Sequence, residues 1–167
     1  AFLQEIQSSQ VKPIEPVFVD FQKDMSKLEA QAGIPVLYKK NETTGLFNLM
    51  YVIETGTNTD PVLNLAFQYL DYLGTSQKSA EQIKQEFYNI ACGYGITAGA
   101  DRSYVSLSGL SENMPAAMQL FEELIADAQP NEAILENLKA DMIKARADAK
   151  LNQGANFGAL NRYATFG

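Results

Sequence analysis

The sequence predicts an α+β domain in which a largely antiparallel sheet carries helices packed on one face. Strand-like runs come in two neighbouring pairs joined by turns, and amphipathic helical runs follow each pair. The chain has 167 residues, which is long enough to bury a real core. Strands that pair across short turns are antiparallel, so the helices are expected to cover a single face of the sheet.

The first 32 residues are predicted to be a linker with one short helix. VKPIEPVFVD holds two prolines close together, which favours an extended run. FQKDMSKLEAQAG is a candidate helix, with Met25 and Leu28 as its apolar residues and Gly33 as its stop. We therefore place the α+β domain at residues 33–167.

Two strand-like runs open this domain. Ile34 to Lys40 is short and rich in β-forming residues, and LFNLMYVIETG follows the turn NETTG. Apolar residues occupy both faces of the second run, as they do in a strand that is covered on both sides. We expect the two runs to form a hairpin and the second run to be a central strand.

Two helices are expected next. Asp60-Pro61 supplies a cap and a first-turn proline for a helix whose apolar stripe runs from Leu63 to Leu73. Gly74 is expected to end that helix. Ser79 to Gln82 is a capping box, which predicts the start of the following helix.

The second half of the chain repeats this order. GYGITAGA and RSYVSLSGL predict a second hairpin. Asn113 and Pro115 open a third helix, which has the most regular apolar stripe of the chain. Pro130-Asn131 ends it and begins a long helix through Leu151, and a last helical run reaches Gly167.

The composition excludes several classes of function. Thirteen Lys and Arg against twenty Asp and Glu give a net charge of −7, which disfavours a nucleic-acid surface. No apolar run approaches the roughly 20 residues of a membrane span. The single cysteine, Cys92, cannot form an internal disulfide and is interpreted as a small buried hydrophobic residue.

Histidine is absent from the chain, which removes Ser-His-Asp catalysis, Cys-His catalysis and every zinc site that contains histidine. A carboxylate site for magnesium or calcium stays open, although no Asp-rich loop of calcium-binding spacing occurs.

The order of the elements, together with three local strings, resembles one domain of the insulinase/pitrilysin family of zinc metallopeptidases. The strings are GLFNLMYVIETGTNTDP, YLDYLGT and SAEQIKQEFYNIACGYGITAGADRSYVSLSGLSENMPAAMQLFEELI, and the resemblance covers residues 34–151. It implies the same α+β fold. It also implies that a full domain continues into further strands and a helix, so that this sheet is truncated or is completed by another molecule.

The resemblance assigns the family's zinc motif, His-x-x-Glu-His, to the helix of residues 63–73. In that motif two histidines hold zinc and the glutamate activates the metal-bound water. The best-fitting register places Gln68, Asp71 and Tyr72 at the three positions. Gln and Tyr are poor zinc ligands, so we expect no catalytic residue, no metal site and no cofactor in this chain.

Large members of the family resemble four copies of such a domain around a chamber, and only the first copy holds zinc. A linker followed by a hairpin and a histidine-free helix resembles the third copy. The implied partners are the catalytic half of the same polypeptide, which would carry the zinc, and a peptide substrate in the shared chamber. An extracytoplasmic bacterial setting, in the periplasm or cell envelope, suits the family.

Three other interpretations are open. The chain could be a stand-alone α+β binding or assembly module, since fold does not fix function. It could be the last copy of the family, which lends an Arg and a Tyr to the reaction, but Lys84 is the only basic residue in the helix that precedes Gly93. A carboxylate-based hydrolase would require paired acids, such as Asp71 and Glu81, to meet in one pocket.

Overall fold

The computed structural model describes residues 3–4, 8, 15–16 and 18–167. It divides into two compact units, residues 1–42 and 43–167. The division falls after Glu42, whereas the sequence suggested a boundary at residue 32. Half of the extended run expected at residues 11–20 lies outside the described residues.

The first unit contains a small two-stranded sheet. β1 (Ser26–Glu29) and β2 (Pro35–Tyr38) pair antiparallel, with Ser26 opposite Tyr38, and a 3₁₀ turn, η1 (Gln31–Gly33), joins them. The short helix expected at 21–33 is therefore wrong. Gly33 takes a positive φ of 76°, which lets the chain reverse, and a local hairpin closes at small entropic cost.

The second unit is built on a three-stranded antiparallel sheet in the order β3-β5-β4. Its strands are β3 (Leu46–Ile53), β4 (Cys92–Ala98) and β5 (Ser103–Leu110). The predicted second hairpin, β4–β5, is confirmed. The first predicted hairpin is wrong, because β2 pairs with β1 and β3 pairs with β5.

The central strand of this sheet is β5. The expectation that β3 would be central is wrong, since β3 has β5 as its neighbour on one side and forms an edge. The two strands differ in burial as their positions require: Leu107 of β5 is 0% exposed, whereas Met50 of β3 is 54% exposed. Apolar residues on both faces of β3 therefore do not indicate that both faces are covered.

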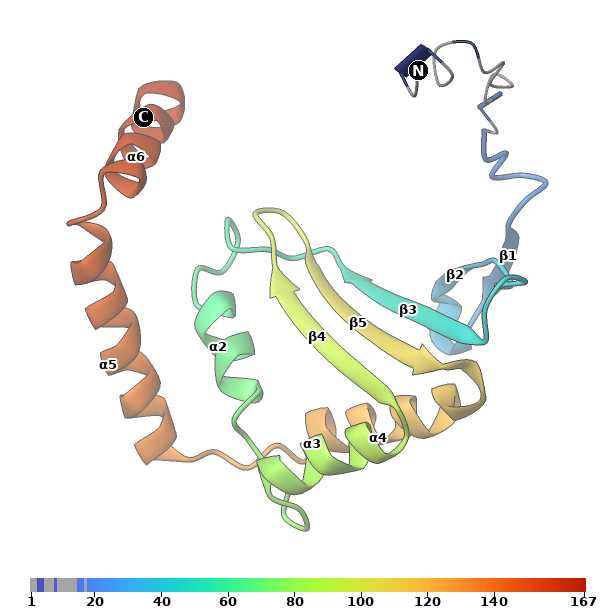
Figure 1. Ribbon diagram of the computed structural model, residues 1–167. Coiled ribbons are helices and arrows are strands. Elements are labelled where there is room, and N and C mark those ends of the chain that lie inside the picture. The colour runs from blue at the N-terminus through green and yellow to red at the C-terminus, as the bar shows by residue number, and fades with distance from the viewer. Residues whose placement is uncertain (1–2, 5–7, 9–14, 17) are drawn as a thin grey trace. The chain divides into compact units, whose positions relative to one another are not determined.

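Helices cover one face of the sheet, which confirms the α+β class (Figure 1). α2 (Leu63–Leu70) and α3 (Ala80–Asn89) pack against β4, and α4 (Met114–Ala126), which follows the 3₁₀ turn η2 (Ser111–Asn113), packs against β4 and β5. Two further helices follow, α5 (Glu132–Ala149) and α6 (Gln153–Phe166). No helix in the described part of the chain is long and apolar enough to cross a membrane.

The core lies between β5, α3 and α4. Its buried members are Ile83, Phe87, Val105, Leu107, Ala117, Leu120, Phe121 and Leu124. Tyr94 of β4 packs between two of them, with its ring centroid 5.0 Å from that of Phe87 and 5.3 Å from that of Phe121. These contacts fix β4 against the helices.

The predicted helix starts are mostly confirmed. Ser79 and Gln82 form both bonds of a capping box at the start of α3, and Pro115 lies in the first turn of α4. At α2 the Asp60 carboxylate accepts a bond from the Val62 N–H at 2.9 Å, and the helix itself begins at Leu63. α2 ends at Leu70, earlier than the expected Gly74.

Candidate functional site

The position that the resemblance assigns to the zinc motif is the end of α2. The hydrogen bonds there are of the 3₁₀ type. The N–H groups of Tyr72 and Leu73 donate to the carbonyls of Tyr69 and Leu70, three residues earlier, at 3.0 and 3.1 Å. Gln68 lies on an exposed face of the last helical turn, whereas Asp71 and Tyr72 follow that turn. The three residues therefore do not share the regular helical face on which an i, i+4 pair of ligands would stand.

Asp71 and Tyr72 line one hollow of about 430 Å³ at the junction of α2, α3 and β4. Lys84 of α3 lies there with its Nζ atom 5.5 Å from the centre of the Tyr72 ring, a cation–π contact. The Asp71 carboxylate lies near the phenol of Tyr94 in the same hollow. Gln68 is not among the residues that line this hollow.

Tyr94 is the electrostatically unusual group of this hollow. Burial of its phenol, and then the neighbouring Asp71 carboxylate, raise the pKa of Tyr94 to about 12. At neutral pH the phenol is therefore protonated. Asp71 thus lies beside Tyr94 of β4 at the end of α2.

The described residues contain no group of three or more Cys, Asp or Glu side chains placed to hold a metal ion. Asp71 and Glu81, the pair that a carboxylate hydrolase would need, line different hollows. The structure therefore does not bring them into one pocket, and what remains at Asp71 is a single carboxylate among aromatic side chains.

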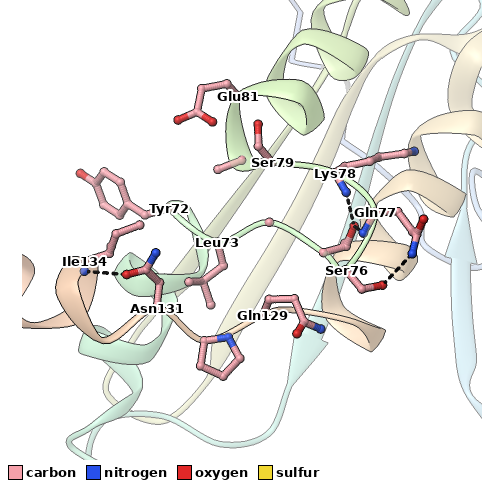
Figure 2. A pocket seen from close by; sticks show the side chains of 14 residues that line it. Tyr72, Leu73, Ser76, Gln77, Lys78, Ser79, Glu81, Gln129, Asn131 and Ile134 are labelled. Atoms are coloured by element: carbon pink, nitrogen blue, oxygen red, sulfur yellow. Dashed lines mark hydrogen bonds between the residues drawn. The ribbon is translucent and has the colours of Figure 1, made fainter.

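A second hollow, of about 460 Å³, lies where the α2–α3 loop meets the segment before α5 (Figure 2). Ser76, which lines this hollow, makes two hydrogen bonds to the Asp127 carboxylate. Its backbone N–H donates at 2.8 Å and its hydroxyl donates at 2.5 Å. These bonds lower the pKa of Asp127. Figure 2 also shows Asn131, whose side chain accepts a bond from the Ile134 N–H at 3.1 Å and so caps α5.

The α2–α3 loop is fixed by ionic contacts as well. Lys78 donates to Glu86 of α3 at 2.7 Å and to Glu123 of α4 at 3.3 Å. The hydrogen bond to Glu86 is the main reason that the pKa of Lys78 is raised. Ser76 and Lys78 are thus bonded inside the domain, as residues of a structural junction are.

Cys92 and Arg102 each have identifiable neighbours in the structure. Cys92 is partly buried at the hollow of Asp71, beside the α-carbon of Gly109. Arg102 bonds Glu54 at 2.8 Å on the surface of the β4–β5 turn. The contacts of Asp127 with Ser76 and of Tyr69 with Asn131 were not expected from the sequence, because no periodicity or motif relates residues 51 and 62 positions apart.

Solved structures share this fold. A peptidase M16 inactive domain from Pseudomonas fluorescens matches with a TM-score of 0.70 and 23% identity, over 79% of this chain and 33% of that chain. The periplasmic protease PqqL from Escherichia coli matches with a TM-score of 0.71 and 17% identity, over 95% of this chain and 20% of that one. The ferredoxin protease FusC, solved with Arabidopsis ferredoxin, matches with a TM-score of 0.70 and 14% identity, over 93% and 19%.

These matches confirm the resemblance at the level of the fold: the chain has the fold of a domain of M16-type proteases, one of the matches being an inactive domain. No family model and no curated protein match the sequence. The chain spans a third or less of the length of the three structures described, so it corresponds to one part of each.

Proposed function

We propose that this chain is a non-catalytic domain of a larger zinc metallopeptidase, in which it forms part of the wall of the substrate chamber and packs against the catalytic half. The proposal rests on the residues at the end of α2. The positions that the resemblance assigns to the zinc motif hold Gln68, Asp71 and Tyr72 in a chain without histidine, and the one carboxylate among them lies beside the phenol of Tyr94.

Two further observations support an architectural role. The fold is shared with a domain described as inactive and with parts of longer proteases. The loop that follows α2 is held by Ser76, Lys78 and their carboxylate partners on neighbouring segments. The zinc of the parent protein would belong to its catalytic half, and one matched protease being periplasmic favours an extracytoplasmic setting.

Zinc titration and peptide hydrolysis test the first part of the proposal. The isolated chain is expected to show no stoichiometric zinc binding by calorimetry and no cleavage of unstructured peptides with zinc added. Asp71→Asn is the matched control, because any residual weak zinc binding should be the same with and without that carboxylate. Tight one-to-one zinc binding that Asp71→Asn abolishes would contradict the proposal.

A test of the proposed role in the chamber wall requires the catalytic half of the parent protein. A catalytic half carrying His-x-x-Glu-His, encoded upstream on the same gene, should gain peptidase activity when this chain is added. A gene in which a start codon directly precedes Ala1, with no such motif upstream, would instead favour the alternative of a stand-alone α+β binding or assembly module.

A further inference from the structure

The hollow at the junction of α2, α3 and β4 holds two opposite charges that do not neutralise each other. Asp71 and Lys84 both line it, and no ion pair among the described residues joins them. A carboxylate only accepts hydrogen bonds and an ammonium group only donates them. The two side chains can therefore hold the two ends of one ligand that carries both charges.

Lys84 is positioned by an aromatic ring and not by a carboxylate. Its Nζ atom lies 5.5 Å from the centre of the Tyr72 ring, and in the part of the chain that the structure describes no carboxylate forms an ion pair with it. Glu81, one turn earlier on α3, interacts with this charge electrostatically but lines the other hollow. A ring contact directs the ammonium group without using its N–H donors, so they are left for an anionic group.

Most of the remaining wall of this hollow is aromatic, formed by Tyr72, Tyr88, Tyr94 and Phe87. The rings of Tyr94 and Phe87 pack 5.0 Å apart, so the core fixes the inner wall, whereas Tyr88 is 78% exposed. Burial, and then the Asp71 carboxylate, raise the pKa of Tyr94 to about 12, so this phenol adds no charge at neutral pH. Aromatic walls of this kind bind an aromatic group by stacked or edge-to-face contacts.

We propose that this hollow binds a zwitterionic α-amino compound with an aromatic side chain, which is the chemistry of a free aromatic amino acid or of a short peptide. The ammonium group of the ligand binds Asp71, its carboxylate binds Lys84, and its ring lies among the tyrosines. The volume of about 430 Å³ lies toward the lower end of the roughly 300–1,000 Å³ of small-molecule sites, so it suits one small ligand. This site goes beyond the proposed architectural role and does not depend on it.

Titration of the full chain with L-phenylalanine, followed by calorimetry, tests the site. Saturable one-to-one binding with a dissociation constant of about 1 mM or below is expected. Three related probes each lack one group: N-acetyl-L-phenylalanine has no ammonium group, L-phenylalaninamide has no carboxylate, and glycine has no ring. Each should bind at least about tenfold more weakly, at the scale of one hydrogen bond to a charged group or one aromatic contact.

Variants of the chain assign each contact to its side chain. Asp71→Asn should weaken binding of L-phenylalanine about tenfold and leave that of N-acetyl-L-phenylalanine unchanged. Lys84→Met should weaken L-phenylalanine to a similar extent and leave L-phenylalaninamide unchanged. Lys144→Met is the matched control, because Lys144 is an exposed lysine of α5 that does not line this hollow. It should leave every affinity unchanged.

Glycyl-L-phenylalanine distinguishes the two sources of the ligand, because it carries the same charges further apart. Tighter binding than that of L-phenylalanine assigns the site to short peptides, and weaker binding assigns it to free amino acids. The proposal is overturned if neither probe binds saturably, or if the losses in Asp71→Asn and Lys84→Met are the same for all the phenylalanine probes. Zinc binding and peptide hydrolysis, which test the architectural role, are separate measurements, so failure of one proposal does not imply failure of the other.

Discussion

The phenol of Tyr69 holds both backbone groups of Asn131: it donates to the carbonyl oxygen at 2.8 Å and accepts from the N–H at 2.5 Å. Tyr69 belongs to the last turn of α2, and Asn131 is the cap of α5. This double contact fixes the point at which α5 leaves the core, because α5 has no buried residue of its own.

Tyr69→Phe keeps the ring and removes both bonds. We expect a loss of about 1–2 kcal/mol in the free energy of unfolding, at the scale of one to two net hydrogen bonds. Hydrogen exchange should become faster in the first turn of α5 than in α3. Tyr88→Phe is the control, since Tyr88 is 78% exposed and its hydroxyl can be removed at little cost. Equal rates of hydrogen exchange in both variants would show that the two bonds between Tyr69 and Asn131 do not hold the start of α5.

Gly109 of β5 is required by the close approach of the α3–β4 connection. Its φ is +155°, and a β-carbon there would collide with the Sγ atom of Cys92 and the carbonyl oxygen of Ala91. Both atoms are tightly placed, so Gly109→Ala should destabilise the domain by about 2–4 kcal/mol in urea unfolding.

Gly93→Ala is the matched control for Gly109→Ala. Gly93 lies in the neighbouring strand, and a β-carbon there would meet nothing within 4 Å. Because alanine restricts the unfolded chain more than glycine does, Gly93→Ala should stabilise the domain by about 0.4–1 kcal/mol. Similar losses in the two variants would show that backbone propensity in the sheet, and not the contact with Cys92, sets the cost.

The bond between Ser76 and Asp127 predicts a dependence of stability on acid. The hydroxyl and then the N–H of Ser76 lower the pKa of Asp127 from its usual value of 3.8. As the pH falls, Asp127 therefore takes up a proton in the unfolded state before it does so in the folded state. The stabilisation that its bonds with Ser76 give is complete above pH 3.8 and disappears as the pH falls through the lower pKa of the folded state. Urea midpoints of wild type and Asp127→Asn should converge in that acid range.

Ser76→Ala refines this prediction. It removes the hydroxyl bond and keeps the backbone N–H bond, so it should show a smaller loss at neutral pH than Asp127→Asn does. If Asp127→Asn keeps the full acid dependence of wild type, another carboxylate is responsible.

Features that rest on local chemistry could be predicted from the sequence. The capping box of Ser79 and Gln82, the β4–β5 hairpin and the buried stripe of α4 all depend on residues within one turn or one hairpin of each other. Their signals are strong because neighbouring side chains alone decide the conformation.

Features that depend on distant partners could not be predicted. The residues of β1 fit a short helix as well as a strand, and only pairing with β2 decides between them. β3 has the pattern of a buried strand, yet its place at the edge follows from β5 pairing on one side alone. At the candidate site, the neighbourhood of Asp71 and Tyr94 joins residues that no motif relates.

Tyr94 predicts a dependence of stability on alkali. Its pKa is raised from 10.0 to about 12, chiefly by burial and then by the Asp71 carboxylate. As pH rises through 10, the unfolded phenol ionises while the folded phenol keeps its proton, so the free energy of unfolding falls until the folded group titrates near 12. Tyr94→Phe should remove this part of the alkaline loss and keep the packing against Phe87 and Phe121.

The role of Asp71 in that shift can be isolated by Asp71→Asn. Removing the negative charge should lower the pKa of the Tyr94 phenol toward 10, which the ultraviolet absorbance of phenolate reports directly, with Tyr94→Phe identifying the contribution of this side chain among the eight tyrosines. The fall in stability would still begin near pH 10 but would end at a lower pH, so it would become smaller. An unchanged Tyr94 titration in Asp71→Asn would mean that burial alone sets the pKa of Tyr94.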